Sequence, residues 1–373
     1  MKIIHAADLH LDSPMKTHLD GEKAEKRKNE LTLNFSRLCD TAADLKVKAV
    51  LIAGDLFDTK SVSKKVANIV LGQINKYKDI DFYYLRGNHD RDSFLSFIKS
   101  TGDIPSNFHM FEDEWSSYCL NPESDGRKIM LYGAEFNNNA SKIITLFNAD
   151  FNDINIVTLH GQENEYTGKD KTDIVPISAL RGRGIDYLAL GHVHEHKIKT
   201  LDSRGIYCYP GCLEGRGFDE CGDHGFVLLD IDEENGDIIP QFIDFAYRKL
   251  HTLDIDISNL ENSGEIIEKI GKDIMACRYS PRDMVKIRLV GEVDENAEIN
   301  EMLIADAFKD EYFFVKVKNE SSVRVNYMKY ALDESLKGWF IRLVQNSDEI
   351  DEETKGQIVR MGLNALSGEE IVQ

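Results

Sequence analysis

The chain has 373 residues, of which 42% are hydrophobic and 29% are charged, and its formal net charge at pH 7 is −20. This length and composition predict a globular protein with more than one domain. Residues 251–373 carry 15 Lys and Arg against 25 Asp and Glu, which leaves 30 against 40 for the first 250 residues. Because neither part is basic, the composition excludes nucleic-acid binding by a basic stripe alone, and any DNA-directed function needs local positive charge, metal or a partner.

The beginning of the chain, "MKIIHAADLHLDS", has only a short apolar run before Asp8 and His10. This pattern fits neither a signal peptide nor a membrane span, so we expect a cytoplasmic protein with no membrane association. The six cysteines form no C-x-x-C pair, which indicates reduced thiols rather than a disulfide framework or a zinc site.

Along the first 245 residues, short apolar runs are each followed at once by polar residues: "KIIHAA", "VKAVLIA", "DFYYL", "INIVTL" and "IDYLAL". Continuous apolar runs of this length are typical of strands buried on both faces in a layered α/β fold. Apolar residues at helical spacing predict helices within residues 22–46 and 62–78. The later strands "KIMLYGAEF", "GIYCYPG", "HGFVLLDID" and "IPQFIDF" have fewer helices between them, which predicts a mixed sheet or a second sheet packed on the first.

The pattern changes after Arg248. The segments that follow alternate as β-α-β-α-β, which is enough for a small independent domain. From about residue 326 we expect a helix with one apolar side, formed by Tyr327, Tyr330, Leu332, Leu336, Phe340 and Leu343, and then a shorter helix after the acidic "SDEIDEETKG". These last helices have little of their own to pack on, so their apolar side is either core or a surface for a partner.

The polar residues after the five early strands are the candidate site. In layered α/β folds the carboxyl ends of neighbouring strands share one edge, so these side chains are expected to converge. They are Asp8, His10, Asp55, Asn88, His160, His192 and His194. Each one alone is more often a cap or turn residue, and the prediction of a site depends on the whole set.

Carboxylate, amide and imidazole ligands without thiolate favour Mn, Fe or Zn over Ca or Mg. Seven ligands are too many for one ion and suit two ions that share a bridging carboxylate. Two such ions would clamp the oxygens of a phosphoryl displacement and lower the pKa of a water between them. Gly54, Gly87 and Gly191 fit this interpretation, because tight turns near the ions favour residues without a Cβ.

The order D-L-H, G-D-L-F-D, G-N-H-D, H-G-Q and G-H-V-H resembles the five-part signature of the calcineurin-like metallophosphoesterases, over residues 1 to about 245. Within that superfamily, "DLHLDSP", "LRGNHD" and "YPGCLEGRGFDE" look most like the SbcD-type DNA-repair exonucleases, bacterial relatives of the archaeal and eukaryotic double-strand-break repair nuclease. The tail and "GRGFDE" are similar to the YhaO-like subgroup. After residue 250 the resemblance rests on the order of elements alone.

The resemblance implies a four-layer α-β-β-α sandwich at residues 1–247, a small α+β capping domain at 248–325 and a helical segment at 326–373. It also implies that the helical segment binds an SbcC-type ABC ATPase with a coiled coil, that the nuclease forms a homodimer, and that its substrate is DNA. Manganese is the usual activator in the family, and Fe, Zn and Mg are alternatives.

Carried onto this sequence, the resemblance implies that one ion is held by Asp8, His10, Asp55 and His194. Asp55 would bridge to a second ion, which is completed by Asn88, His160 and His192. His89 would act on the phosphate, either by stabilising the transition state or by protonating the leaving oxygen. No role follows for His196, which we expect to lie outside the ligand shell.

Arg86, Arg91 and Arg216 lie beside the motifs and could form a positive rim for a phosphodiester backbone, although solvated surface charge is the alternative for each. Asp58 and Asp90 are expected behind the ligands or as caps. His5, inside an apolar strand, is expected to be a core histidine.

The function expected from these patterns is that of a manganese-dependent DNA phosphodiesterase, an exonuclease or endonuclease of double-strand-break repair that works with an ATPase. A metallophosphatase or phosphodiesterase for small molecules or phosphoproteins is the first alternative. A non-catalytic adaptor for an ABC ATPase is the second.

Overall fold

The computed structural model describes residues 1–15, 19–58, 62–90, 92–102, 104–135, 144–163, 173–294, 297–324 and 327–367. Arg91, one of the predicted substrate-binding residues, lies outside them. The chain divides into two compact units, Met1–Lys249 and Leu250–Gln373.

The described part of the first unit contains two six-stranded sheets. The first has the order β14-β13-β1-β2-β3-β4, with β1 to β4 parallel and β13 and β14 antiparallel. Its strands are β1 (Lys2–Ala6), β2 (Ala49–Ala53), β3 (Asp81–Leu85), β4 (Phe108–Met110), β13 (Gly225–Ile231) and β14 (Ile238–Asp244).

The second sheet has the order β11-β12-β10-β7-β6-β5, with a parallel centre and an antiparallel strand at each edge. Its strands are β5 (Ser116–Cys119), β6 (Ile129–Gly133), β7 (Ile154–His160), β10 (Tyr187–Gly191), β11 (Lys197–Thr200) and β12 (Ile206–Tyr209). Between β7 and β10 in the sequence, β8 (Gln162–Glu163) and β9 (Ile174–Val175) form a short parallel pair of their own.

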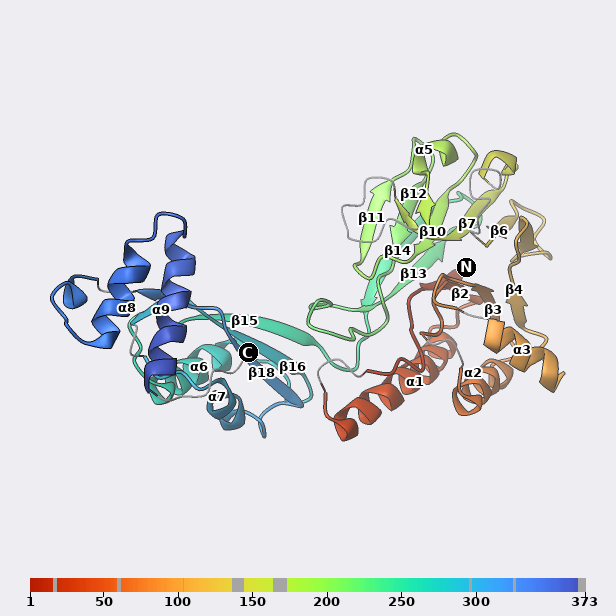
Figure 1. The fold of residues 1–373 in the computed structure, drawn as a ribbon. Helices are drawn as coiled ribbons and strands as arrows, with labels where there is room; N and C mark the ends of the chain where they lie inside the picture. Colours follow the sequence, from red (N-terminus) through yellow and green to blue (C-terminus); the bar gives the residue numbers. More distant parts are fainter. Residues whose placement is uncertain are drawn as a thin grey trace. The chain divides into compact units, whose positions relative to one another are not determined.

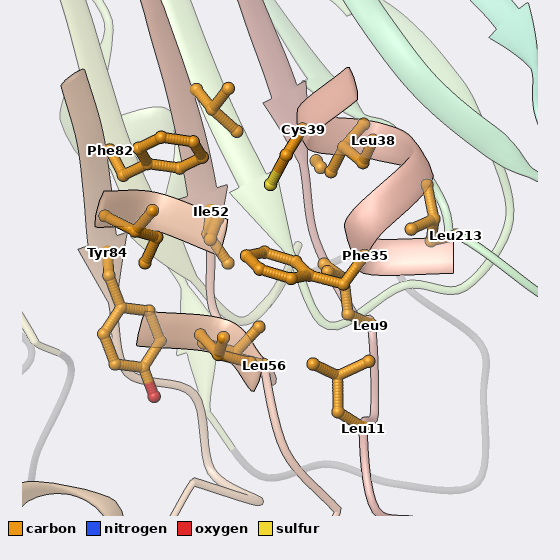
Figure 2. Close-up of a cluster of buried hydrophobic side chains, with 14 of the residues drawn as sticks. Leu9, Leu11, Phe35, Leu38, Cys39, Ile52, Leu56, Phe82, Tyr84 and Leu213 are labelled. Carbon is orange, nitrogen blue, oxygen red and sulfur yellow. The ribbon is translucent and has the colours of Figure 1, made fainter. Parts of the chain in front are cut away.

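Helices cover the outer faces. On the first sheet lie α1 (Gly21–Asp44), α2 (Lys64–Lys76) and α3 (Asp92–Thr101), as Figure 1 shows. The side chains of Asp20 and Ser63 cap the first two helices by accepting backbone N–H groups, which fixes where these helices begin. In Figure 2, Phe35 and Leu38 of α1 pack against Ile52 of the sheet. The outer face of the second sheet packs against α5 (Ile177–Leu180).

A separate core joins the two sheets. Leu51 and Leu85 of the first sheet pack with Ile156 and Ala189 of the second, and all four are fully buried. The layers are therefore helix, sheet, sheet and helix, which confirms the four-layer sandwich predicted from the sequence. The central strands β1, β2, β3, β7 and β10 are buried on both faces, which explains their continuous apolar runs.

The second unit begins with the predicted β-α-β-α-β order, and its three main strands form a parallel sheet, β15-β16-β18. The elements are β15 (Leu250–Asp256), α6 (Ser263–Cys277), β16 (Met284–Val290), α7 (Glu301–Ala307) and β18 (Phe314–Asn319), and a small pair of β17 (Glu292–Asp294) and β19 (Ser322–Arg324). The sheet and the two helices share one apolar core.

The last part of the chain differs from the sequence prediction. In place of one helix from Tyr327 there is a 3₁₀ turn, η1 (Tyr327–Tyr330), and then α8 (Leu336–Gln345), because Ser335 caps a new helix by accepting the N–H of Gly338. Of the apolar residues predicted to share one side, Leu332, Leu336 and Leu343 are 94%, 71% and 74% exposed, which favours a surface over core for this part of the apolar side.

The buried residues of α8 are Ile341 and Val344, which pack against Val359 and Leu363 of α9 (Glu352–Ser367). A Cβ at Gly356 of α9 would lie 2.9 Å from the carbonyl oxygen of Val323 in β19. The helices therefore belong to the same compact unit as the sheet, and the division at residue 326 into a capping domain and a helical segment stays a prediction. Among the described residues, no helix is both long and apolar enough to cross a membrane.

Candidate metal centre

The predicted ligands follow strands whose carboxyl ends meet. Asp8 follows β1, Asp55 follows β2 and Asn88 follows β3, whereas His160 ends β7 and His192 follows β10. The backbone turns sharply here, with φ of 52° at Asp8, 51° at Asp55 and 93° at His192. Left-handed backbone is uncommon for residues with a Cβ and is concentrated at functional sites, where it aims side chains inward.

One group of ligand atoms is formed by Asp8, His10 and His194. The two Nε2 atoms of His10 and His194 are 3.0 Å apart, and Nε2 of His194 is 4.0 Å from Oδ1 of Asp8. Asp8 also accepts the backbone N–H of His192 with both oxygens, at 3.1 and 3.0 Å. Burial and the positive charge of Arg216 lower the pKa of His10, which keeps its imidazole in the neutral form that binds metal.

A second group is formed by Asp55, His160, Asn88 and His192. Oδ1 of Asn88 is 3.0 Å from Nε2 of His160 and 3.2 Å from Nδ1 of His192, and Oδ2 of Asp55 is 3.4 Å from Nε2 of His160. The other nitrogen of His160, Nδ1, is 2.9 Å from the carbonyl oxygen of Ala53 and donates to it. That bond leaves Nε2 as the ring nitrogen that faces the ligand cluster and is available to a metal ion.

Three glycines let the backbone of the site pass close to the ligands and to a neighbouring strand. A Cβ at Gly54, where φ is 95°, would lie 2.0 Å from Nδ1 of His160, and a Cβ at Gly87 would lie 2.2 Å from Oδ1 of Asp55. A Cβ at Gly191 would lie 2.0 Å from the carbonyl oxygen of Ala53. All three were expected from the sequence as sites of close approach.

The electrostatics of the cluster call for a cation. Burial raises the pKa of Asp8 to about 6, although His194 and His160 oppose the shift. Burial alone would lower the pKa of His160, but the carboxylates of Asp55 and Asp8 outweigh it and raise that pKa to about 10. A buried imidazole that holds a proton so tightly lies in a strongly negative field, which a metal cation would neutralise in the proton's place.

The donor set fits a pair of divalent ions. All seven predicted ligands come together, and Asp55 lies between the two groups, with Oδ2 toward His160 and Oδ1 accepting the N–H of His89 at 2.9 Å. In addition, Nδ1 of His10 is buried and has no hydrogen-bond partner among the described residues. The assignment of single ligands to either ion stays a prediction.

Residues 1–196 match the family model described as calcineurin-like phosphoesterase. The chain belongs to this family. Members of the family use a dinuclear metal centre, and the clustered residues of this phosphoesterase are the candidates to hold it.

Three curated relatives are similar to this phosphoesterase. An uncharacterized metallophosphoesterase, YhaO of Bacillus subtilis, is 30% identical over 65% of the chain and 60% of its own length, so the match leaves part of that relative uncovered. The DNA double-strand break repair protein Mre11 of Methanopyrus kandleri is 24% identical over 79% of the chain and 69% of its own length. Its counterpart in Sulfolobus acidocaldarius is 22% identical over 95% of the chain and 93% of its own length.

His89 lies next to the ligands of this phosphoesterase but turns its ring to Asp58. Its Nδ1 is 2.8 Å from Oδ1 of Asp58, and 47% of its side chain is exposed. The hydrogen bond to Asp58 raises the pKa of His89. The imidazole is thus oriented, accessible and supported by a carboxylate, as a residue that acts on substrate must be.

The two predicted substrate-binding arginines that the structure describes, Arg86 and Arg216, are both held by carboxylates. Nε and Nη2 of Arg86 both donate to the carboxylate of Glu135, the first at 2.5 Å. Nη1 of Arg216 donates to Oδ2 of Asp58 at 2.8 Å. Arg86 lines a cavity of about 260 Å³ with Asn88 and His160, whereas Arg216 faces the supporting carboxylates. Their binding of substrate stays a prediction.

Three acidic residues lie behind the ligands, of which Asp90 was expected there from the sequence and Glu220 and Glu135 were not. Oε1 of Glu220 is 2.6 Å from Nδ1 of His194, and Glu135 neutralises Arg86. Asp90 accepts the N–H groups of Leu56, Phe57 and Gly87 at 3.2, 2.9 and 2.9 Å and so ties two ligand loops together. Glu220 lies in the quoted segment "YPGCLEGRGFDE", but nothing in the spacing shows that it reaches His194.

His196 points away from the cluster. Its Nδ1 is 3.0 Å from the carbonyl oxygen of Tyr209, and its ring stacks on Phe242 with 4.4 Å between centroids. His196 therefore lies outside the ligand cluster, as expected from the sequence.

Proposed function

We propose that this phosphoesterase is a manganese-dependent DNA phosphodiesterase, the nuclease subunit of a double-strand-break repair complex. The observation that carries the proposal is the similarity to the archaeal DNA double-strand break repair protein Mre11 of Sulfolobus acidocaldarius, which covers 95% of this chain and so extends through both units. The complete set of clustered ligands supports a working catalytic centre over a non-catalytic adaptor.

Two bound ions would activate a water molecule and neutralise the charge that develops on the phosphoryl group. The seven clustered side chains would hold them. His89, which projects from the loop after β3 with its Nδ1 held by Asp58, is placed to stabilise the phosphate or to protonate the leaving oxygen through Nε2. Asp90 keeps the loops of Asp55 and Asn88 at a fixed spacing through its three backbone hydrogen bonds.

A second candidate, a phosphodiesterase or phosphatase for small phosphoesters, is favoured by one observation. Arg86 and Arg216, the two described arginines beside the site, are both neutralised by carboxylates, and the chain as a whole has a net charge of −20. A duplex held by this chain alone would meet little uncompensated positive charge. DNA cleavage therefore depends on the ions and on a partner that binds the DNA.

The test is an assay of the purified protein with Mn²⁺ on plasmid, single-stranded and hairpin DNA, beside p-nitrophenyl phosphate and bis(p-nitrophenyl) phosphate. The proposal predicts cleavage of DNA and of the diester, and loss of both activities in His89→Gln. Fast turnover of the monoester without any DNA cleavage would support the second candidate and overturn the first.

The partner we propose is an ABC ATPase of the SbcC type, which would dock on α8. Leu336, Trp339 and Leu343 of α8 recur at helical spacing and are 71%, 66% and 74% exposed. Exposed large apolar side chains on one helical stripe are typical of a protein interface. Because the buried side of α8 already packs on α9, the exposed stripe is available to a second chain.

Co-expression with an SbcC-type ABC ATPase tests the docking surface. Trp339→Ser with Leu343→Ser should abolish co-purification and leave the melting temperature unchanged, because neither side chain is buried. Met275→Ser is the matched control, since Met275 lies on α6 of the same unit and is 79% exposed. Equal retention of the ATPase by all variants would refute this surface.

A further inference from the structure

Arg216 lies in the loop between β12 and β13, and its guanidinium bridges two carboxylates. Nη1 donates to Oδ2 of Asp58 at 2.8 Å and Nη2 donates to Oε1 of Glu220 at 3.3 Å. The backbone N–H of Arg216 donates to Oε2 of the same Glu220 at 2.7 Å. A planar guanidinium can serve two carboxylates at once, which a single ammonium group cannot do with the same geometry.

Each of these carboxylates supports a different histidine of the site. Asp58 contacts Nδ1 of His89 at 2.8 Å, and Glu220 contacts Nδ1 of His194 at 2.6 Å. His89 follows a strand of the first sheet and His194 follows a strand of the second. The hydrogen-bonded series His89, Asp58, Arg216, Glu220 and His194 therefore crosses from one sheet to the other, and Arg216 is its middle member.

The loop that carries Arg216 is anchored by a buried network of its own. Glu214 accepts Nη1 of Arg27 at 2.7 Å and the backbone N–H groups of Tyr247 and Arg248 at 2.6 and 3.1 Å. Nη2 of Arg27 also donates to the carbonyl oxygen of Gly215 at 2.7 Å. Because the neighbouring residues are fixed in this way, the guanidinium of Arg216 is already hydrogen-bonded to Asp58 and Glu220 before any substrate binds.

We propose that Arg216 is a positioning residue that sets the spacing of His89 and His194 by bridging Asp58 and Glu220. Without the bridge, two partly buried carboxylates lose their shared cation, and each histidine loses the constraint on its ring. The bridge acts through other residues and not on the phosphate. This replaces the sequence prediction of a substrate-binding Arg216 with a role behind the site.

The inference rests on the proposed phosphodiesterase activity, and kinetics with Mn²⁺ and bis(p-nitrophenyl) phosphate separate the two roles. Loss of a positioning residue lowers kcat, whereas loss of a substrate-binding arginine raises KM. For Arg216→Met we expect kcat to fall by about 10- to 100-fold, the range for groups that orient metal ligands, with KM changed by less than about twofold. A raised KM with an unchanged kcat would overturn the proposal.

Mn²⁺ affinity, measured by titration calorimetry, gives a readout that needs no substrate. Arg216→Met and Glu220→Gln should each weaken binding by about 10-fold, and the double variant should bind no more weakly than the worse single variant, because both act through His194. Additive losses, or unchanged affinity in both single variants, would contradict the bridge even if the protein cleaved none of the test esters. A failure of the proposed activity is thus distinguishable from a failure of this inference.

Arg204→Met is the matched control. Arg204 is 23% exposed beside 20% for Arg216, and it too is held by a carboxylate, with Nε 3.0 Å from Oδ1 and Nη2 2.9 Å from Oδ2 of Asp186. It should keep the kcat, KM and Mn²⁺ affinity of the native chain. Should Arg216→Met fail to fold, Arg216→Lys keeps the charge but not the fork and should show the same fall in kcat to a smaller extent.

Discussion

The two units of this chain differ in what they bury. The first unit buries charged and polar side chains in number, among them Asp8, Asp55 and His160, each at most 2% exposed. Within the described residues of the second unit, the buried polar side chains are Ser263, Asp283 and Lys355. Both units nevertheless contain parallel strands joined by helices, so strand arrangement by itself does not make a catalytic centre.

The strand ends of the two units show what is needed in addition. At the end of β15, Asp256 accepts the N–H and the hydroxyl of Ser258 through Oδ1, at 2.9 and 2.6 Å, so its hydrogen bonds are made within its own turn. In the first unit, carboxylates and imidazoles from different strands point at one another, and the candidate metal groups of the described chain all lie there. Convergent ligands with incomplete protein partners distinguish the site from a set of capped turns.

The comparison is tested most severely by Asp55→Asn, which keeps the shape of the side chain and removes its charge. Asp55 lies between both ligand groups, so Mn²⁺ affinity and phosphodiesterase activity should each fall by more than the roughly 100-fold that loss of an outer partner costs. Asp256→Asn, at the corresponding strand end of the second unit, should change neither. Calorimetric titration of both variants decides, and equal losses would show that the centre is not confined to the first unit.

The pH dependence of folding stability tests how strongly the first unit buries His5. It is fully buried on β1, its Nδ1 is 2.9 Å from the hydroxyl of Tyr187, and burial lowers its pKa from 6.5 to about 3. Because the unfolded chain takes up a proton below pH 6.5 and the folded chain does so only near pH 3, stability is fully present above pH 6.5 and is lost as the pH falls between these values.

The measurement is urea unfolding from pH 7 to pH 4 of the native chain and of His5→Leu. At pH 7 the variant should be less stable by about 1 kcal/mol, the worth of one hydrogen bond. By pH 4 the native chain should have lost about 3 kcal/mol more than the variant, since each pKa unit corresponds to about 1.4 kcal/mol. Parallel pH profiles would mean that His5 is not held neutral by burial.

The sequence predicted the buried strands and the polar residues that follow them. Continuous apolar runs identified the buried strands, and the polar residues that follow them identified Asp8, Asp55 and His160 as neighbours. The four-layer sandwich and the family were predicted and are confirmed. The strands and their neighbouring ligands follow from local patterns and from the rule that parallel strands share an edge, whereas the sandwich and the family were implied by the resemblance of the five motifs.

What the sequence could not supply are contacts between loops distant along the chain. Glu220 reaches His194 across 26 positions, and Arg216 reaches Asp58 across 158, without any periodic pattern. The sequence also left open whether the apolar side of α8 is core or a partner surface. Helical spacing shows that apolar residues share a face, but Leu336 and Leu343 turned out to lie on the face that the α8–α9 contact leaves open.

Gly191→Ala tests the close approach of the two sheets. Its Cβ would lie 2.0 Å from the carbonyl oxygen of Ala53 and 2.8 Å from Nδ1 of His160, the two atoms that are hydrogen-bonded to each other at 2.9 Å. Because backbone must move to make room, we expect a loss of about 2 kcal/mol in the free energy of unfolding, together with weaker Mn²⁺ binding. Unfolding and titration of the same preparation measure both, and a variant with native values would show that the approach is looser than the structure has it.

The smallest effect has the opposite sign and comes from the second unit. Gly271 lies inside α6, and apart from its chain neighbours and the backbone of the helix itself no atom lies within 4 Å of the position that a Cβ would take. Gly271→Ala should therefore stabilise the chain by about 0.5 to 1 kcal/mol through helix propensity alone and leave Mn²⁺ binding unchanged. The same substitution would then weaken one unit and strengthen the other, because the glycine of the first unit keeps backbone next to ligands whereas the glycine of the second faces open space.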